Sequence, residues 1–210
     1  MSRDIAEILS LSPVIPVLTI TDVNHAVPLA RALMRGGLNV LEITFRTEAA
    51  QEAIRRIVGE VPDAVVGAGT VTAPHHFAEA ARDGARFAVS PGATPRLLEA
   101  AKDSPLAWLP AAATAGEAMT LAENSYTHLK FFPAETSGGV AALKQLAAPL
   151  PLIHFCPTGG LTQENAPAYL ACPNVFAVGG SWPAPSDAVK AGAWDRVEAA
   201  ARAAAALRAV

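Results

Sequence analysis

Eight short apolar runs, many of them rich in β-branched residues, recur along the chain at a nearly constant interval. The runs are VIPVLTI from Val14, VLEITF from Val40, VVGAGT from Val65, RFAVSP from Arg86, AWLPAA from Ala107, HLKFFPA from His128, LIHFCPTGG from Leu152 and VFAVGGS from Val175. Seven steps cover the 161 residues from Val14 to Val175, which is 23 residues per step. That interval has room for one strand, one helix and two short loops.

The segments between the runs have helical periodicity. AVPLARALMRGG ends at Gly36 and Gly37, and TPRLLEAAKDSP stops at a proline. Strands that alternate with helices pair in parallel through right-handed crossovers. Eight such units predict an α/β protein with one domain, residues 1–210, folded as a closed (β/α)8 (TIM) barrel. We expect an extra N-terminal helix before Ser12 to close the barrel floor, and a final packing helix from Trp194 to Val210.

An open, doubly wound sheet is the alternative architecture. Its dinucleotide-binding fingerprint needs three glycines after a strand, and GAGTVT from Gly67 has Thr72 where the third should stand. One near match of this kind is weak evidence for either fold.

Composition and charge exclude several classes of partner. The 210 residues are 51% apolar and carry 16 basic against 19 acidic residues, with no basic tract to follow nucleic acid. The first segment is charged at Arg3, Asp4 and Glu7, and no run reaches membrane-spanning length, so we expect a cytoplasmic protein without a membrane partner. Cys156 and Cys172 lack metal-ligand spacing and are expected to be reduced thiols.

Charged residues fall on the interior face of two expected strands. Alternation along VLEITFR places Leu41, Ile43 and Phe45 against the helices, which turns Glu42 and Arg46 toward the barrel axis. An unpaired charge there is costly unless it has a partner or a chemical role.

The strand that begins at His128 places Lys130 on the same interior face. Interior layers of such a barrel draw side chains from alternate strands, so Glu42 on the second strand and Lys130 on the sixth are expected to meet near the centre. The other three lysines, Lys102, Lys144 and Lys190, lie in helix or loop patterns. The alternatives are a purely structural buried ion pair, or a lysine that guards an edge strand.

A buried lysine beside a carboxylate suits covalent carbonyl chemistry. Burial disfavours an ammonium ion, and a free amine can attack a carbonyl to form an iminium, which acts as an electron sink. Glu42 is placed to relay protons. Arg46 presents a fork suited to a substrate carboxylate, although pairing with Glu42 or with a surface aspartate is the alternative.

Glycine pairs follow the last two expected strands, in PTGG (157–160) and VGGS (178–181). Glycines let backbone N–H groups approach an anion, and the corresponding loops of barrel enzymes commonly bind phosphate. The alternative is that both pairs merely form tight turns.

Other polar residues are weaker candidates. His75 and His76 open a helical segment, but adjacent residues do not share a helix face, so solvated rings are expected and no metal site. Cys156 is expected to be interior packing. Glu135, at the expected mouth of the barrel, is equally well explained as a solvated surface residue.

The motifs together resemble the family of 2-keto-3-deoxy-6-phosphogluconate (KDPG) and 4-hydroxy-2-oxoglutarate aldolases. The matching segments are GLNVLEITFRT, VGAGTV, VSPGAT, LKFFPAE, FCPTGG and VGGSW. The resemblance implies a class I, Schiff-base lyase that needs no metal or cofactor, forms a homotrimer, and cleaves its phosphorylated keto acid to pyruvate and glyceraldehyde 3-phosphate in the Entner–Doudoroff pathway.

Site roles carry over position by position. The resemblance implies that Lys130 is the Schiff-base lysine and Glu42 the general acid and base. The substrate-binding positions that it implies are Arg46 and Thr70 for the carboxylate, Pro91 and Phe132 for the pocket wall, Thr158 for hydroxyl groups, and Gly159, Gly160, Gly179, Gly180 and Ser181 for the phosphate. Phe45 stands where a leucine is common.

Three other functions remain open at this point. One is a related aldolase acting on 4-hydroxy-2-oxoglutarate or 2-keto-3-deoxy-6-phosphogalactonate. The second is a phosphosugar isomerase or epimerase, which needs no covalent lysine adduct. The third is a barrel that binds a phosphorylated metabolite without turnover.

Overall fold

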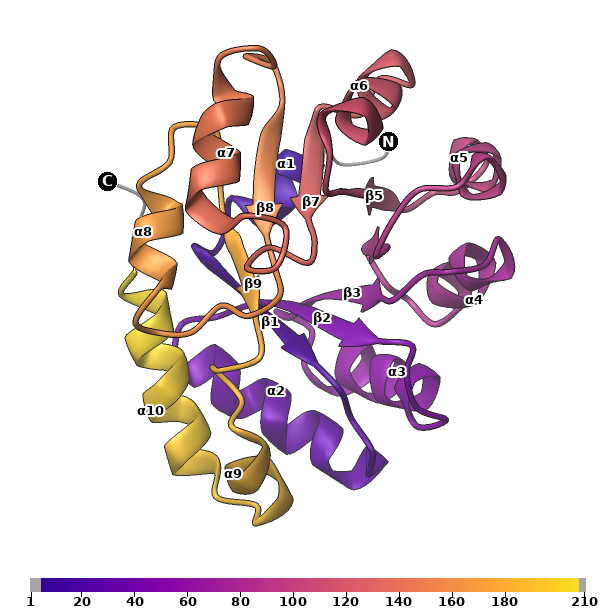
Figure 1. Cartoon of the computed structure of the whole chain (residues 1–210). Helices are drawn as coiled ribbons and strands as arrows, with labels where there is room; N and C mark the ends of the chain where they lie inside the picture. The colour runs from indigo at the N-terminus through magenta and orange to yellow at the C-terminus, as the bar shows by residue number, and fades with distance from the viewer. Residues whose placement is uncertain (1–4, 208–210) are drawn as a thin grey trace.

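The computed structural model describes residues 5–207, so Arg3, Asp4 and residues 208–210 of the expected terminal helices lie outside it. Strands occupy the centre of the molecule and helices lie around them (Figure 1). None of the helices in the described part of the chain is long and apolar enough to cross a membrane.

Six strands form one curled parallel sheet, in the order β5-β4-β3-β2-β1-β9. They are β1 (Val14–Leu18), β2 (Val40–Thr44), β3 (Val65–Gly69), β4 (Phe87–Val89), β5 (Ala107–Leu109) and β9 (Val178–Gly180). A second parallel sheet joins three strands, β6 (Ala111–Ala112), β7 (His128–Phe131) and β8 (His154–Pro157). Every strand pairing in both sheets is parallel, as the alternating pattern predicts.

Two of the expected strands are shorter or split. The run from Ala107 divides at Pro110 into β5 and β6, because proline has no N–H to donate to a neighbouring strand. The Pro110 carbonyl instead accepts a hydrogen bond from the Lys130 backbone N–H at 2.8 Å. The run from Val175 is a strand only in β9, although isolated bridges join Val175 to Phe155 and Gly179 to Thr158.

The helices follow the strands in chain order. They are α1 (Ile5–Leu9), the 3-10 turn η1 (Val23–His25), α2 (Ala26–Arg35), α3 (Ala50–Glu60), α4 (His75–Arg82), α5 (Pro95–Lys102), α6 (Ala115–Glu123), α7 (Gly139–Ala147), α8 (Ala166–Leu170), α9 (Ser186–Lys190) and α10 (Trp194–Ala205). Their starts have local causes: the Thr94 hydroxyl accepts the Leu97 N–H at the start of α5, and Thr114 with Glu117 forms a capping box on α6.

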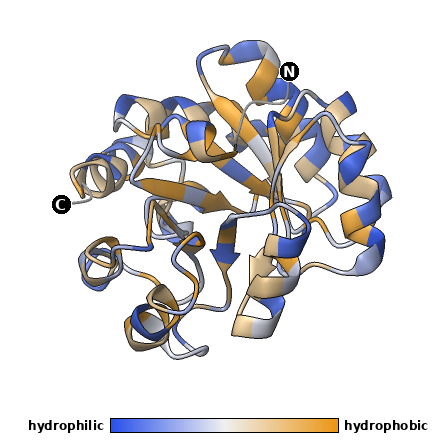
Figure 2. Cartoon of the chain, turned by 90° about the horizontal axis from the view of Figure 1, so that it is seen from above, coloured by the Kyte–Doolittle hydropathy of each residue, from blue (hydrophilic) through white to orange (hydrophobic). Residues whose placement is uncertain are grey.

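Alternate residues of the strands enter two separate apolar clusters. Leu41 and Ile43 pack with the helices, whereas Val40 joins a second cluster on the concave side of the curled sheet. This second cluster also contains α1 residues and Cys156. Figure 2 shows hydrophobic residues concentrated on the central strands, while the surrounding helices carry both hydrophobic and hydrophilic residues. Strand alternation therefore correctly assigned these faces.

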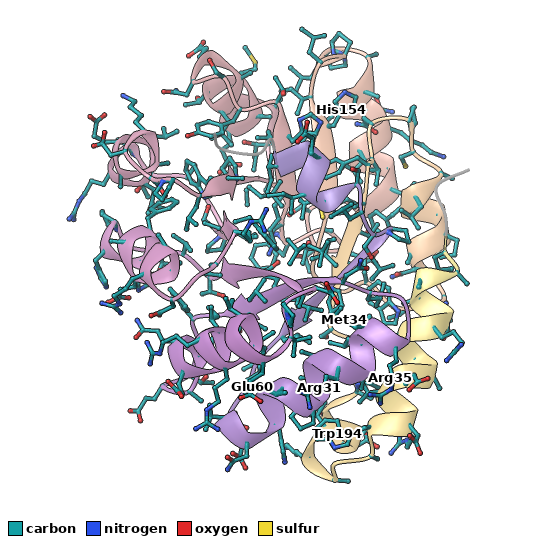
Figure 3. The ribbon with its side chains drawn as sticks, turned by 180° about the vertical axis from the view of Figure 1, so that it is seen from behind. Arg31, Met34, Arg35, Glu60, His154 and Trp194 are labelled. Atoms are coloured by element: carbon teal, nitrogen blue, oxygen red, sulfur yellow. The ribbon has the colours of Figure 1, made fainter. Side chains whose placement is uncertain are left out.

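Helices α2 and α10 touch almost backbone to backbone. A Cβ on Gly36, the residue that ends α2, would lie 2.4 Å from the Ala201 Cβ and 2.8 Å from the Glu198 carbonyl oxygen. The same pair of helices is joined by an ion pair of 2.7 Å between Arg35 and Glu198. Figure 3 labels Arg35 on α2 and Trp194 at the start of α10. Glycine at position 36 sets the distance between these helices.

We predict that Gly36→Ala lowers the free energy of unfolding by about 1–3 kcal/mol, because the added methyl forces α2 and α10 apart. The matched control is Gly59→Ala inside α3, where a Cβ meets nothing within 4 Å. Helix propensity should make that control neutral or stabilising by up to about 1 kcal/mol. Urea unfolding followed by circular dichroism measures both. Equal stability of the two variants would contradict the close packing.

Candidate active site

Lys130 and Glu42 meet inside the molecule, as the strand parity indicated. Lys130 comes from β7 and Glu42 from β2, and the Lys130 Nζ lies 3.3 Å from the Glu42 Oε1. Only 6% of the lysine side chain and 4% of the glutamate side chain are exposed. The two side chains form the most deeply buried ion pair in the described part of the chain.

The glycines of β3 make room for this pair. A Cβ on Gly69 would lie 2.3 Å from the Glu42 Oε1, and a Cβ on Gly67 would lie 2.3 Å from the Phe87 ring. The glycines of the GAGT segment therefore leave space for the Glu42 carboxylate. The comparison with a dinucleotide-binding fingerprint did not suggest this role. The signal was available in the sequence: two glycines at alternate positions of a strand leave one face of it bare.

Apolar and weakly polar groups surround Lys130. Its Nζ lies 5.3 Å from the centroid of the Phe132 ring, a distance that gives a cation–π attraction. Cys156 is the cross-strand partner of Lys130 on β8. Burial raises the pKa of the Cys156 thiol to about 12, against the lowering effect of Lys130, so the thiol is neutral at physiological pH and adds no charge to the site.

Arg46 and Thr70 contact each other at the ends of β2 and β3. The Arg46 Nε donates a hydrogen bond of 3.0 Å to the Thr70 Oγ1. No ion pair found among residues 5–207 includes Arg46, so its expected alternative pairing with a carboxylate is wrong. Thr70 has a φ of +59°, an unusual conformation for a β-branched residue, and such strain is typical of functional sites.

A cavity of about 260 Å³ opens where several of these strands end. Its walls combine the Arg46 side chain with residues from the loops after β7, β8 and β9. The lining residues are Val17, Thr19, Arg46, Phe132, Thr158, Gly159, Gly160, Leu161, Gly180 and Ser181. One cation and two glycine loops thus face a common space, an arrangement suited to a small molecule with an anionic group at each end.

The structure places the remaining candidates less directly. Pro91 is exposed beyond the end of β4, and Gly179 lies behind Thr158, where a Cβ would be 2.3 Å from the threonine Oγ1. The sequence reasoning missed Val17, Thr19 and Leu161. Thr19 follows β1 and contacts the Thr44 hydroxyl at 3.0 Å. Position at a strand end was the available signal for Thr19, because parallel strands bring such ends together.

A larger cavity, about 390 Å³, lies at the opposite ends of the strands. It is lined by residues such as Ile5, Trp108 and His128, where β5 and β7 begin. We assign the chemistry to the smaller cavity, because its wall includes Arg46 and Phe132, and the Phe132 ring lies 5.3 Å from the Lys130 Nζ.

His75 and His76 lie closer together than expected. Their ring centroids are 4.5 Å apart, and ligand atoms of both rings and of Glu79 lie within 4.8 Å of one another, although adjacent residues were expected not to share a helix face. The rings can approach because His75 only opens α4, and His76 turns back to accept the Thr72 N–H on Nδ1. That bond occupies one nitrogen of His76 and places the proton of the neutral ring on the other, which disfavours a metal ligand.

A parallel α/β fold that buries a lysine and a carboxylate below a cavity has the groups that enzymes acting on carbonyl compounds use. The comparisons identify the family. The model of the aldolase family described as KDPG and KHG aldolase matches residues 5–200, and the chain belongs to that family.

Relatives of known name cover nearly the whole chain. The 2-dehydro-3-deoxy-phosphogluconate aldolase of Pseudoalteromonas atlantica is 53% identical over 191 residues, 91% of this chain and 89% of that protein. The KHG/KDPG aldolase of Escherichia coli K12 is 48% identical over 195 residues, 93% of this chain and 92% of that protein.

Solved structures agree with the fold. A KDPG aldolase from Legionella pneumophila, with pyruvate captured as a covalent carbinolamine intermediate, has a TM-score of 0.93 and 42% identity, and the match covers 95% of this chain and 97% of that chain. The 2-keto-3-deoxy-6-phosphogluconate aldolase of Zymomonas mobilis ZM4 with 3-phosphoglycerate has a TM-score of 0.92 and 44% identity, covering 99% and 98%.

We predict that Thr70→Gly raises the melting temperature while it weakens binding at the Arg46 end of the cavity. Glycine relieves a strain of about 1–3 kcal/mol at a positive φ, partly offset by about 0.5–1 kcal/mol of extra backbone entropy in the unfolded chain. Loss of the Thr70 Oγ1 frees the Arg46 side chain. Thermal unfolding and a pyruvate titration measure the two effects. A lower melting temperature would show that the conformation of Thr70 is not strained.

Proposed function

We propose that the chain is a class I aldolase that cleaves 2-keto-3-deoxy-6-phosphogluconate to pyruvate and D-glyceraldehyde 3-phosphate, as in the Entner–Doudoroff pathway. The observation that carries this proposal is the buried contact of 3.3 Å between Lys130 and Glu42 beside the two-ended cavity. The names and identities of the relatives support the same reaction.

The cavity suggests how the substrate lies. Arg46, oriented by Thr70, binds the carboxylate beside the C2 carbonyl through its guanidinium fork. The glycine loops after β8 and β9 bind the phosphate through backbone N–H groups. Between them, Thr158 is placed for the substrate hydroxyls, Phe132 forms a wall, and Pro91 contributes at the mouth.

Lys130 forms the covalent intermediate. Its ammonium group first gives a proton to Glu42; the free amine then adds to C2, and the carbonyl oxygen takes up the proton that the amine nitrogen loses, which gives a carbinolamine. Glu42 then gives a proton to the departing hydroxyl, water leaves, and an iminium remains between Lys130 and C2. The lysine itself supplies the electron sink, so the step needs no added cofactor.

Glu42 moves the proton during cleavage. It takes the proton from the C4 hydroxyl as the C3–C4 bond breaks, and the electrons of that bond flow into the iminium to give an enamine. The aldehyde leaves with its phosphate from the glycine loops. Glu42 returns the proton to C3, and water hydrolyses the resulting iminium to release pyruvate and restore the ammonium group of Lys130. Each proton that Glu42 accepts is thereby returned.

We propose further that residues 1–210 form one closed (β/α)8 domain. The bridges from Phe155 to Val175 and from Thr158 to Gly179, together with the hydrogen bond from Lys130 to Pro110, support continuity between the two sheets. The burial of Ile5 and Leu9 of α1 in the concave cluster supports an N-terminal helix that closes the floor.

A homotrimer in the cytoplasm is the proposed working state. The trimer rests on the family resemblance, and sedimentation equilibrium tests it against three times the 21.6 kDa of one chain. The two cysteines, both buried free thiols, support a reducing compartment.

A second substrate is 4-hydroxy-2-oxoglutarate. The description of the family and the name of the E. coli relative both include the KHG activity, and the cavity can receive a keto acid with a carboxylate in place of the phosphate.

We predict that treatment with pyruvate and borohydride forms one stable adduct on Lys130. Mass spectrometry of the peptides locates the modified residue. Lys130→Ala should abolish both the adduct and KDPG cleavage, and Glu42→Gln should slow cleavage by about a hundredfold or more, because it cannot carry the proton. Lys144→Ala, which removes an exposed lysine from α7, is the matched control and should leave both unchanged.

Other outcomes separate the competing functions. Isomerase activity without any lysine adduct would favour an isomerase or epimerase. Binding of phosphorylated keto acids without turnover would favour a non-catalytic binding protein. Near-normal cleavage by Lys130→Ala would overturn the covalent mechanism.

A further inference from the structure

The carbonyl groups of Gly159 and Gly160 are both held from outside the cavity. The Gly159 oxygen accepts the Glu135 backbone N–H at 3.1 Å, and the Gly160 oxygen accepts the Asn165 Nδ2 at 3.2 Å. Both glycines have a positive φ, +101° and +81°, which few other residues adopt. The loop is therefore fixed in a conformation that its glycines permit but do not themselves select.

Anchored carbonyls determine where the next N–H groups point. In a trans peptide the C=O and the following N–H lie on opposite sides of the chain. The N–H groups of Gly160 and Leu161 consequently face away from Glu135 and Asn165, and both residues line the cavity. Neither N–H has a hydrogen-bond partner within residues 5–207. Two adjacent free donors of this kind form an anion-binding concavity.

A polar network holds the two anchors in place. The Tyr169 hydroxyl of α8 donates a hydrogen bond to the Glu135 Oε1, and the Asn165 Nδ2 reaches the same oxygen at 3.4 Å. The Asn165 Oδ1 accepts the Thr162 N–H at 2.8 Å, so its amide orientation is fixed.

Burial of Tyr169 restrains the exposed Glu135. Tyr169 is 1% exposed, and desolvation, followed by the bond to Glu135, raises the pKa of its phenol, so the hydroxyl stays a donor at physiological pH. Glu135 also packs directly against the loop, because a Cβ on Gly160 would lie 2.6 Å from the Glu135 Cγ.

We propose that Asn165 and Glu135, with Tyr169 behind them, are positioning residues that aim the Gly160 and Leu161 N–H groups at the substrate phosphate. They thereby set the preference for phosphorylated over unphosphorylated keto acids. This proposal rests on the proposed function for the identity of the substrate, but the anion site itself can be measured without turnover.

The test compares the two ends of the cavity in Asn165→Ala. We expect the KM for KDPG and the inhibition constant for inorganic phosphate each to rise about tenfold, the size expected when a hydrogen bond to a charged group is misaligned. Exchange of the pyruvate methyl protons with solvent deuterium, which uses only Lys130, Glu42 and the Arg46 end, should change much less. Asn124→Ala at the end of α6 makes the same chemical change outside the site and is the matched control.

Glu135 distinguishes positioning from general damage to the fold. Glu135→Gln keeps an oxygen that accepts from Tyr169 and Asn165, so it should bind phosphate within about twofold of the original chain, whereas Glu135→Ala and Tyr169→Phe should weaken phosphate binding. A melting temperature for each variant accompanies the measurements.

Each result bears on one claim. An unchanged phosphate constant in Asn165→Ala, or an equal loss in the KDPG reaction and in pyruvate exchange, would overturn the positioning role. Absence of pyruvate exchange and cleavage in the original chain would overturn the proposed function instead. Phosphate binding measured directly by calorimetry would still decide the positioning role in that case.

Discussion

The buried contact between Lys130 and Glu42 is the interaction on which the rest of the site depends. Removing two charges from water costs several kcal/mol for each ion, and their attraction offsets that cost only in good geometry. Strands of two different sheets supply the geometry, because β2 and β7 fix both backbones. The bare face of β3 at Gly69 supplies the space. A rigid sheet is therefore a requirement of the chemistry as well as its support.

In the proposed binding mode, the two ends of the cavity recognise anions by different means. At one end an exposed side chain, Arg46, carries a full positive charge and is steadied by a hydrogen bond to Thr70. At the other end the backbone of Gly160 and Leu161 supplies donors that carry only partial charge but cannot swing away. This division suits a substrate whose reacting carbonyl lies beside one anion, because the end near the chemistry can adjust while the distant end remains fixed.

Local alternation along strands was enough to predict much of the fold and the centre of the site. VLEITFR carries Glu42 and Arg46 on its inner face and LKFFPAE carries Lys130, and that pattern does not depend on how the strands are arranged. The parallel pairing followed from the alternation of strands and helices. The family resemblance added Thr70, Pro91 and Thr158, for which the residues alone gave no role.

Features that depend on contact between distant segments could not be predicted in the same way. The division at Pro110 is an exception, because the proline itself signals the missing N–H donor and the expected run nevertheless continued through it. The use of Gly69 becomes visible only when Glu42 lies beside it. A solvated position was an equally good prediction for Glu135, because its contacts with Tyr169 and Asn165 come from a later helix and loop.

The bare face of β3 also limits how such a protein can change. Any side chain at position 69 collides with the Glu42 carboxylate, so the innermost part of the site has no freedom to acquire new groups. The loops beyond the strand ends face fewer constraints of this kind. Descendants of this chain would therefore alter which molecules they accept long before they altered the bond they break.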